Sequence, residues 1–147
     1  MSHANQQAPR RLPIYLRMIF VMVGGGLLAL LAVAASLEPD PSGLGTHQGL
    51  GLPPCSLLTL TGRRCPSCGM TTSWANLVRG RVLTAVEANA GGTMLAATAA
   101  LGGPWLLAAG LWGRWRWFRP NEYMLVGGTL AVVIVTFAQW GWRMLAD

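Results

Sequence analysis

Two cysteines separated by two residues, Cys65 and Cys68, lie in the segment of the chain best suited to chemistry, RRCPSCGMTTSW at residues 63–74. Such a pair at the start of a helix is typical of thiol–disulfide chemistry, because the helix dipole and the neighbouring arginines stabilise a thiolate. The same spacing lets both sulfurs bind one metal ion at about 2.3 Å, and Gly69 permits a tight turn after the second ligand. The residue types leave both chemistries open.

Further ligands are needed for a metal site, because zinc takes four and the pair supplies two. Cys55 and His47 precede the pair in the same loop, so the candidate zinc ligands are Cys55, Cys65, Cys68 and His47. The outer spacing is irregular, and His47 taken alone is more typical of a solvated loop histidine. A structural disulfide from Cys55 to Cys65 or Cys68 is a weaker alternative, because it leaves an odd thiol. No residue is predicted to be catalytic, and a non-enzymatic role is favoured.

Three long apolar blocks must position these residues. Hydrophobic residues make up 52% of the 147-residue chain and charged residues only 11%, which is unusual for a soluble protein. Each block reaches the ~20 residues that a helix needs to cross ~30 Å of hydrocarbon. We therefore predict an all-α membrane protein of one domain, with transmembrane helices at residues 14–37, 88–113 and 123–142.

The arginines predict the orientation of these helices. They cluster before the first helix and between the second and third, at Arg10, Arg11, Arg17, Arg114, Arg116 and Arg119. Under the positive-inside rule both regions are cytoplasmic, which makes residues 1–13 a cytoplasmic tail, 114–122 a cytoplasmic loop and 38–87 an extracytoplasmic loop. The expected location is the inner (cytoplasmic) membrane.

Two other interpretations of the composition are less favoured. The first apolar block is longer than the 7–15 residues of a signal-peptide core, so we expect an uncleaved helix rather than a removed signal. The net charge of +6 does not indicate nucleic-acid binding, because the basic residues stand at helix ends rather than along one face. Glycine pairs within the apolar blocks instead predict close helix packing, self-association or a membrane-protein partner.

Short helices are expected within the loop. Residues 38–54 are rich in Gly and Pro and predict irregular structure, followed by a short helix at 55–60 that Gly62 ends.

An amphipathic helix is expected after the cysteine pair. Its apolar face comprises Met70, Trp74, Leu77 and Val78, and its polar face comprises Thr72, Ser73, Asn76 and Arg79. It either lies along the membrane interface with Trp74 inserted or packs on the transmembrane helices as a lid. Leu83, Val86 and Ala90 predict that a helical period continues into the second span.

The wider pattern resembles a known family. It comprises Cys55, Thr61-Gly62, the run Cys65-Pro66-Ser67-Cys68-Gly69-Met70-Thr71, and then Gly80, Ala85 and Asn89 ahead of a membrane helix. This resembles the domain of unknown function 2752, a family of small bacterial membrane proteins with a Cys-Pro-x-Cys-Gly motif. The resemblance covers about residues 45–95. The chain has Thr72 where many members have Arg, and Ala90 where many have Pro. The resemblance implies a bacterial membrane protein built around the motif and implies no substrate.

Three functions follow from these patterns. The leading hypothesis is a membrane protein with a structural or regulatory zinc site. The second is a thiol–disulfide component that works through Cys65 and Cys68 with a periplasmic or quinone partner. The third is an assembly subunit whose glycine-rich helices dock on a larger membrane complex.

Overall fold

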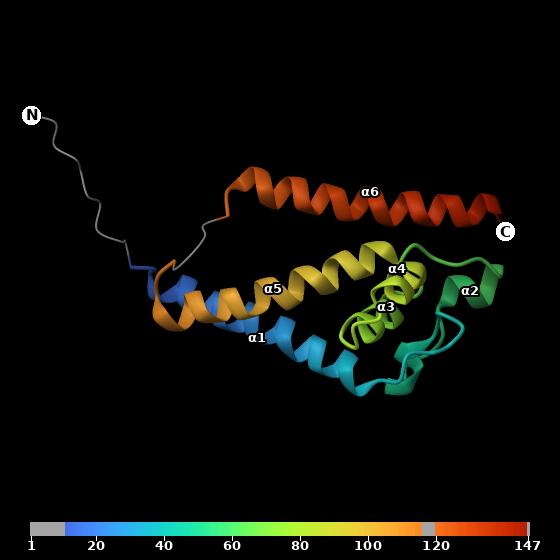
Figure 1. Ribbon diagram of the computed structural model, residues 1–147, viewed down its shortest axis with the longest axis horizontal. Coiled ribbons are helices and arrows are strands. Elements are labelled where there is room, and N and C mark those ends of the chain that lie inside the picture. Colours follow the sequence, from blue (N-terminus) through green and yellow to red (C-terminus); the bar gives the residue numbers. More distant parts are fainter. Residues whose placement is uncertain (1–10, 116–119, 147) are drawn as a thin grey trace, which may run out of the picture.

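The structure, a computed structural model, describes residues 11–115 and 120–146. All secondary structure in these residues is helical, in the order α1 (Ile14–Ser36), the 3-10 helix η1 (Thr46–Leu50), α2 (Ser56–Thr61), α3 (Met70–Leu77), α4 (Val82–Ala88), α5 (Ala90–Trp112) and α6 (Glu122–Ala146) (Figure 1). The helices α1, α5 and α6 are long and apolar enough to cross a membrane. The predicted fold class is confirmed. Residues 1–10 of the predicted tail, which include Arg10, and the arginines Arg116 and Arg119 lie outside the described residues.

The helices α1 and α5 pack side by side and antiparallel, and glycines permit their close approach (Figure 1). A Cβ atom on Gly24 would lie 2.7 Å from the carbonyl oxygen of Gly103, and one on Gly110 would lie 2.8 Å from that of Arg17. Either contact would force the backbones apart. Glycine packing therefore holds this pair, whereas Gly25 has nothing within 4 Å of its Cβ position.

The helix α6 packs on the rest of the chain near one end only. Its second half meets α5 where Thr136 fills the space that a side chain at Gly91 would need. Residues 122–130 of α6 are all exposed, and Gly127 and Gly128 have nothing within 4 Å of their Cβ positions. Figure 1 shows α6 diverging from α5 toward its start. The glycine pair in α6 therefore makes no close helix contact with the described residues of this chain.

Arginine side chains donate hydrogen bonds to carbonyl groups at the C-terminal ends of three helices. The last carbonyl groups of a helix have no partner within it, and that end carries negative partial charge, so a guanidinium is favourable there. Arg17 donates to Gly110 (3.0 Å) and Leu111 (2.9 Å) in α5, Arg79 to Ala35 (3.0 Å) in α1, and Arg143 to Glu87 and Ala88 in α4. Each arginine thus joins two elements that are distant in the sequence.

The amphipathic helix α3 packs on α1, α4 and α5 through its small and polar face. Thr72, Ser73, Ala75 and Asn76 are buried, whereas Val78 is 37% exposed. The predicted periodicity is correct, and α3 covers the long helices as the lid interpretation expects. On the predicted apolar face, Met70, Trp74 and Leu77 are half-buried, and Val78, directly after the helix, is exposed.

The predicted continuation of one helix into the second span is wrong. The chain leaves helical geometry at Asn89 (φ −165°, ψ 109°), so α4 ends at Ala88 and α5 begins at Ala90. The side chain of Asn89 accepts a hydrogen bond from Gly92 N at 2.7 Å, which caps α5. A hydrophobic period cannot reveal this break, because the residues on both sides are apolar and small.

Candidate functional site

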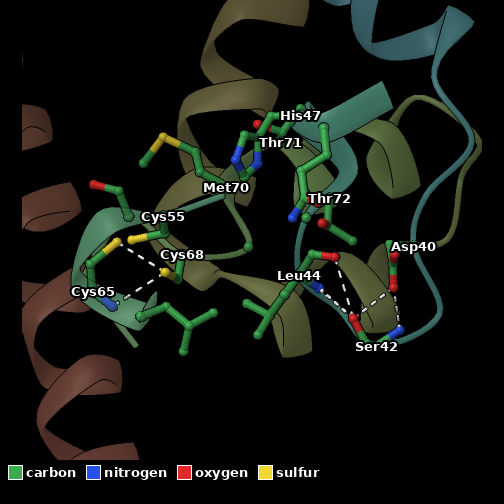
Figure 2. Close-up of a pocket in the computed structure, with 15 residues that line it drawn as sticks. Asp40, Ser42, Leu44, His47, Cys55, Cys65, Cys68, Met70, Thr71 and Thr72 are labelled. Atoms are coloured by element: carbon green, nitrogen blue, oxygen red, sulfur yellow. Dashed lines mark hydrogen bonds between the residues drawn. The ribbon is translucent and has the colours of Figure 1, made fainter. Parts of the chain in front are cut away.

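The three cysteines lie together at the end of the long helices where the short helices α2, α3 and α4 are found. Cys55 stands immediately before α2, whereas Cys65 and Cys68 lie in the turn before α3. Their Sγ atoms all lie within 4.8 Å of one another, and those of Cys65 and Cys68 are 3.0 Å apart (Figure 2). All three are free thiols. Sulfurs around one tetrahedral ion with bonds of ~2.3 Å are roughly 3.5–4 Å apart, so small side-chain rotations would let the cluster hold a metal ion.

The turn that carries Cys65 and Cys68 is defined by backbone hydrogen bonds. Cys68 N donates to Cys65 O at 3.0 Å, and Cys65 N donates to the sulfur of Cys68 at 3.2 Å. Gly69 follows with φ +83°, and a Cβ there would lie 2.5 Å from the carbonyl oxygen of Ala88 and 2.9 Å from that of Gly43. Glycine is therefore required at this position both by its dihedral angle and by space.

Asn89 fastens this turn to α5. Its side chain is 2% exposed, and Nδ2 donates to the carbonyl oxygens of Pro66 (3.0 Å) and Cys68 (3.1 Å). Its Oδ1 accepts from Gly92 N, so one amide group satisfies backbone groups of two segments. The position of the cysteine turn is consequently fixed relative to a long apolar helix.

The helix α6 contacts the same junction. Trp140 Nε1 donates to Arg64 O at 2.7 Å, next to the first cysteine of the pair. Gln139 accepts from Ala90 N at 2.7 Å and donates to Val86 O at 2.9 Å, across the break between α4 and α5. All three long helices are thus connected near the cysteines, α1 through Arg79 of the segment after α3.

The thiols differ in acidity. The pKa of Cys55 is lowered to about 7, chiefly by the backbone N–H of Leu58 in the first turn of α2 and then by the thiol of Cys65. Burial raises the pKa of Cys68 to about 12, and the neighbouring thiol of Cys65 adds to this increase. Cys55 therefore loses its proton more readily than Cys68, whose thiolate form a bound cation would favour.

The cysteines line a pocket of about 440 Å³. Figure 2 shows the sulfurs on one side of it, Asp40 and Ser42 on the other, and His47 with Thr71 on a third. Asp40 Oδ1 accepts hydrogen bonds from Ser42 N (2.8 Å) and Ser42 Oγ (2.6 Å), which lower the pKa of that carboxyl group. The pocket is thus bordered by thiols and by polar side chains.

Of the four candidate ligands, the structure brings together the cysteines and leaves His47 apart from them. His47 lines the same pocket, but its Nε2 lies 3.1 Å from the carbonyl oxygen of Pro53, and its ring nitrogens are not part of the cluster within 4.8 Å.

The roles of Asn89 and Trp140 in holding the cysteine turn are not apparent from residue spacing. The available signal was the helix-capping preference of Asn, directly before the apolar run of α5.

Comparison with known families adds one match. A model of the family described as "Protein of unknown function (DUF2752)" matches residues 55–103. The matched segment contains all three cysteines, Gly69 and Asn89, and it ends within α5. This match supports the family resemblance that the cysteine motif indicates. No curated protein and no solved structure matches the chain.

Proposed function

We propose that this chain is a bacterial inner-membrane protein in which Cys55, Cys65 and Cys68 bind a zinc ion, as the structural or regulatory centre of an extracytoplasmic cap. The observation that carries the proposal is the meeting of three sulfurs from two separate segments within 4.8 Å. Thiolate ligands select zinc and other soft ions over magnesium or calcium. An enzymatic reaction is not part of the proposal.

A bound ion would hold together elements that have little core of their own. The helix α2 has no buried residue, so the cysteine cluster is its main attachment to the turn before α3. Because metal binding and folding are coupled in such sites, removing the ion should loosen α2 first. The turn itself stays fastened to α5 by Asn89.

The proposed orientation places the cysteines outside and the N-terminus in the cytoplasm. Leu12 N donates to Gly113 O at 2.8 Å, so the segments that bear Arg11 and Arg114 lie at the same end of the α1–α5 pair. That end is opposite the end that carries α2, which Cys55 directly precedes (Figure 1). Arg63, Arg64, Arg79 and Arg81 lie in the long loop at the other end and count against this orientation, but long loops weigh less than short ones in setting it. The positive-inside rule, applied to the end that bears Arg11 and Arg114, gives the proposed topology.

Metal analysis of the detergent-purified protein under reducing conditions tests the zinc site. We expect one zinc per chain in the parent protein and loss of that zinc in Cys55→Ser, Cys65→Ser and Cys68→Ser. Ser67→Ala is the matched control, because Ser67 lies between the two cysteines of the turn and is exposed. Reduced parent protein without stoichiometric zinc would refute the proposal.

Thiol–disulfide exchange is the second candidate, and the 3.0 Å separation of the Cys65 and Cys68 sulfurs favours it. Closing this gap to the ~2.05 Å of a disulfide needs little motion. The two thiols would give two electrons and two protons to a partner disulfide or a quinone. Alkylation with and without reductant, followed by mass spectrometry, separates the candidates: a reversible Cys65–Cys68 bond in freshly isolated protein supports exchange, and three reduced thiols with bound zinc support the metal site.

A membrane-protein partner or a second copy of the chain is the remaining proposal for the glycine-rich helices. Residues 122–130 of α6 are exposed and largely apolar, and its glycine pair has no neighbouring helix within the part of the chain that the structure describes. Recovery of a stoichiometric partner, or of a dimer, from mild detergent would support this role, and a monodisperse monomer would count against it.

A further inference from the structure

The three-cysteine cluster has no fourth ligand from the part of the chain that the structure describes. No His, Asp, Glu or further Cys within residues 11–115 and 120–146 places a ligand atom within 4.8 Å of all three sulfurs. His47, the sequence-based candidate, faces Pro53 O with its Nε2, and Asp40 is engaged by Ser42. Zinc bound by three protein ligands keeps its fourth position for a molecule from solution, unlike a closed structural site of four.

The pocket provides the route to that fourth position. All three cysteines line it, so an ion held among their sulfurs has the pocket on its remaining side (Figure 2). Its volume of about 440 Å³ is ample for several water molecules or a small organic donor. Cys68 is only 7% exposed, so the approach is from the side of Cys55 and Thr71, which are both half-buried.

Charge determines which class of donor fits. Zinc with three thiolates carries a net charge of about −1, and the Asp40 carboxylate borders the same pocket. Arg63 and Arg64 precede Cys65 but do not line the pocket. Inside it, an incoming anion would meet like charge from both the zinc site and Asp40, whereas a neutral nitrogen or oxygen donor would not. Resting on the proposed zinc site, we propose that the site is open and that a neutral donor from solution enters through the pocket to complete the coordination of the ion. Such a site can exchange ligands and is therefore suited to sensing or passing on a metal ion.

Cobalt substitution tests this directly in the full-length protein in detergent. Co²⁺ replaces zinc, its thiolate charge-transfer absorption reports binding, and its visible bands report the number and type of ligands. At pH 8, where imidazole is neutral, we expect imidazole to change the visible bands saturably, and azide at equal concentration to change them at least several-fold less. Thr71→Phe should keep the thiolate absorption and lose most of the imidazole response, because the new ring occupies the pocket.

The remaining outcomes overturn the inference in different ways. If parent protein does not respond to imidazole but His47→Ala does, then His47 closes the site. If neither responds, the site is closed by other means, and if azide is as effective as imidazole, then the assignment of a neutral donor is wrong. If reduced protein gives no thiolate–Co²⁺ absorption at all, the zinc site itself is refuted, and the openness of the site fails with it.

Discussion

Replacing Asn89 with alanine removes the connection between the cysteine turn and α5. The loss of the helix cap at Gly92 N costs ~1 kcal/mol. Two carbonyl groups, the part-buried one of Pro66 and the buried one of Cys68, also lose their donor, at about 1 kcal/mol each. The expected destabilisation is therefore about 3 kcal/mol, or roughly 100-fold in the unfolding equilibrium, since 1.4 kcal/mol is tenfold.

The chain contains a matched control for this change. Asn121 also caps a helix, through Oδ1 accepting from Met124 N at 2.9 Å, but it is exposed and makes no contact with the cysteine turn. Asn121→Ala should cost only ~0.5–1 kcal/mol. Asn89→Ser keeps an oxygen for the cap and loses both N–H groups, so it should recover about 1 kcal/mol relative to Asn89→Ala.

Reversible unfolding in mixed micelles, followed by tryptophan fluorescence, measures these differences in the free energy of unfolding. Zinc content measured on the same samples shows whether zinc binding is lost together with the connection between the cysteine turn and α5. The expected order of stability is parent, Asn121→Ala, Asn89→Ser and Asn89→Ala. If Asn89→Ala were no more destabilising than Asn121→Ala, the three hydrogen bonds of Asn89 would not be the connection described above.

Three further outcomes are expected. Gly69→Ala should abolish zinc binding, because its Cβ would lie 2.5 Å from a carbonyl oxygen. The control is Gly80→Ala, at φ +75° in open space, which should lower the free energy of unfolding by only ~1–2 kcal/mol and keep the metal. Gly24→Val should separate α1 from α5 and lower the unfolding midpoint, whereas Gly25→Val, with nothing within 4 Å, should leave it nearly unchanged. In reduced, chelated protein the pKa of Cys55 near 7 predicts that its alkylation rate rises about tenfold from pH 6 to pH 8, as the thiolate forms, and then levels off. A rate still rising steeply above pH 8, measured by peptide mapping, would contradict this value.

Much of the fold could be predicted because it depends on local properties. The length and composition of a membrane-spanning helix are set by bilayer thickness, so α1, α5 and α6 are recognisable from apolar runs alone. The end of α2 was likewise visible, since Gly62 adopts φ +70° there, as a helix-ending glycine does.

The rest could not be predicted because it depends on which surfaces meet. Periodicity identifies the two faces of α3, but in a membrane protein the apolar face can point outward, and the buried face here is that of Ser73 and Asn76. Sequence makes Cys55 the third candidate ligand and His47 a possible fourth, yet only the fold turns the histidine ring toward Pro53 and the thiol toward the cysteine turn. Arg79 is a further case, because its partner carbonyls are 44 and 45 residues away in the sequence.

The one-sided attachment of α6 makes this protein sensitive to bilayer thickness at a single helix. The α1–α5 pair is joined near both ends, by Arg17 at one and through Arg79 of the α3 segment at the other. Among the described residues, the hydrogen bonds from α6 to other segments lie near the cysteines, for example those of Gln139 and Trp140. A mismatch between helix length and hydrocarbon thickness is commonly absorbed by tilting. Here α6 can tilt about its anchored end while the other two helices keep their geometry, so the lipid composition of the membrane sets the angle of one helix out of three.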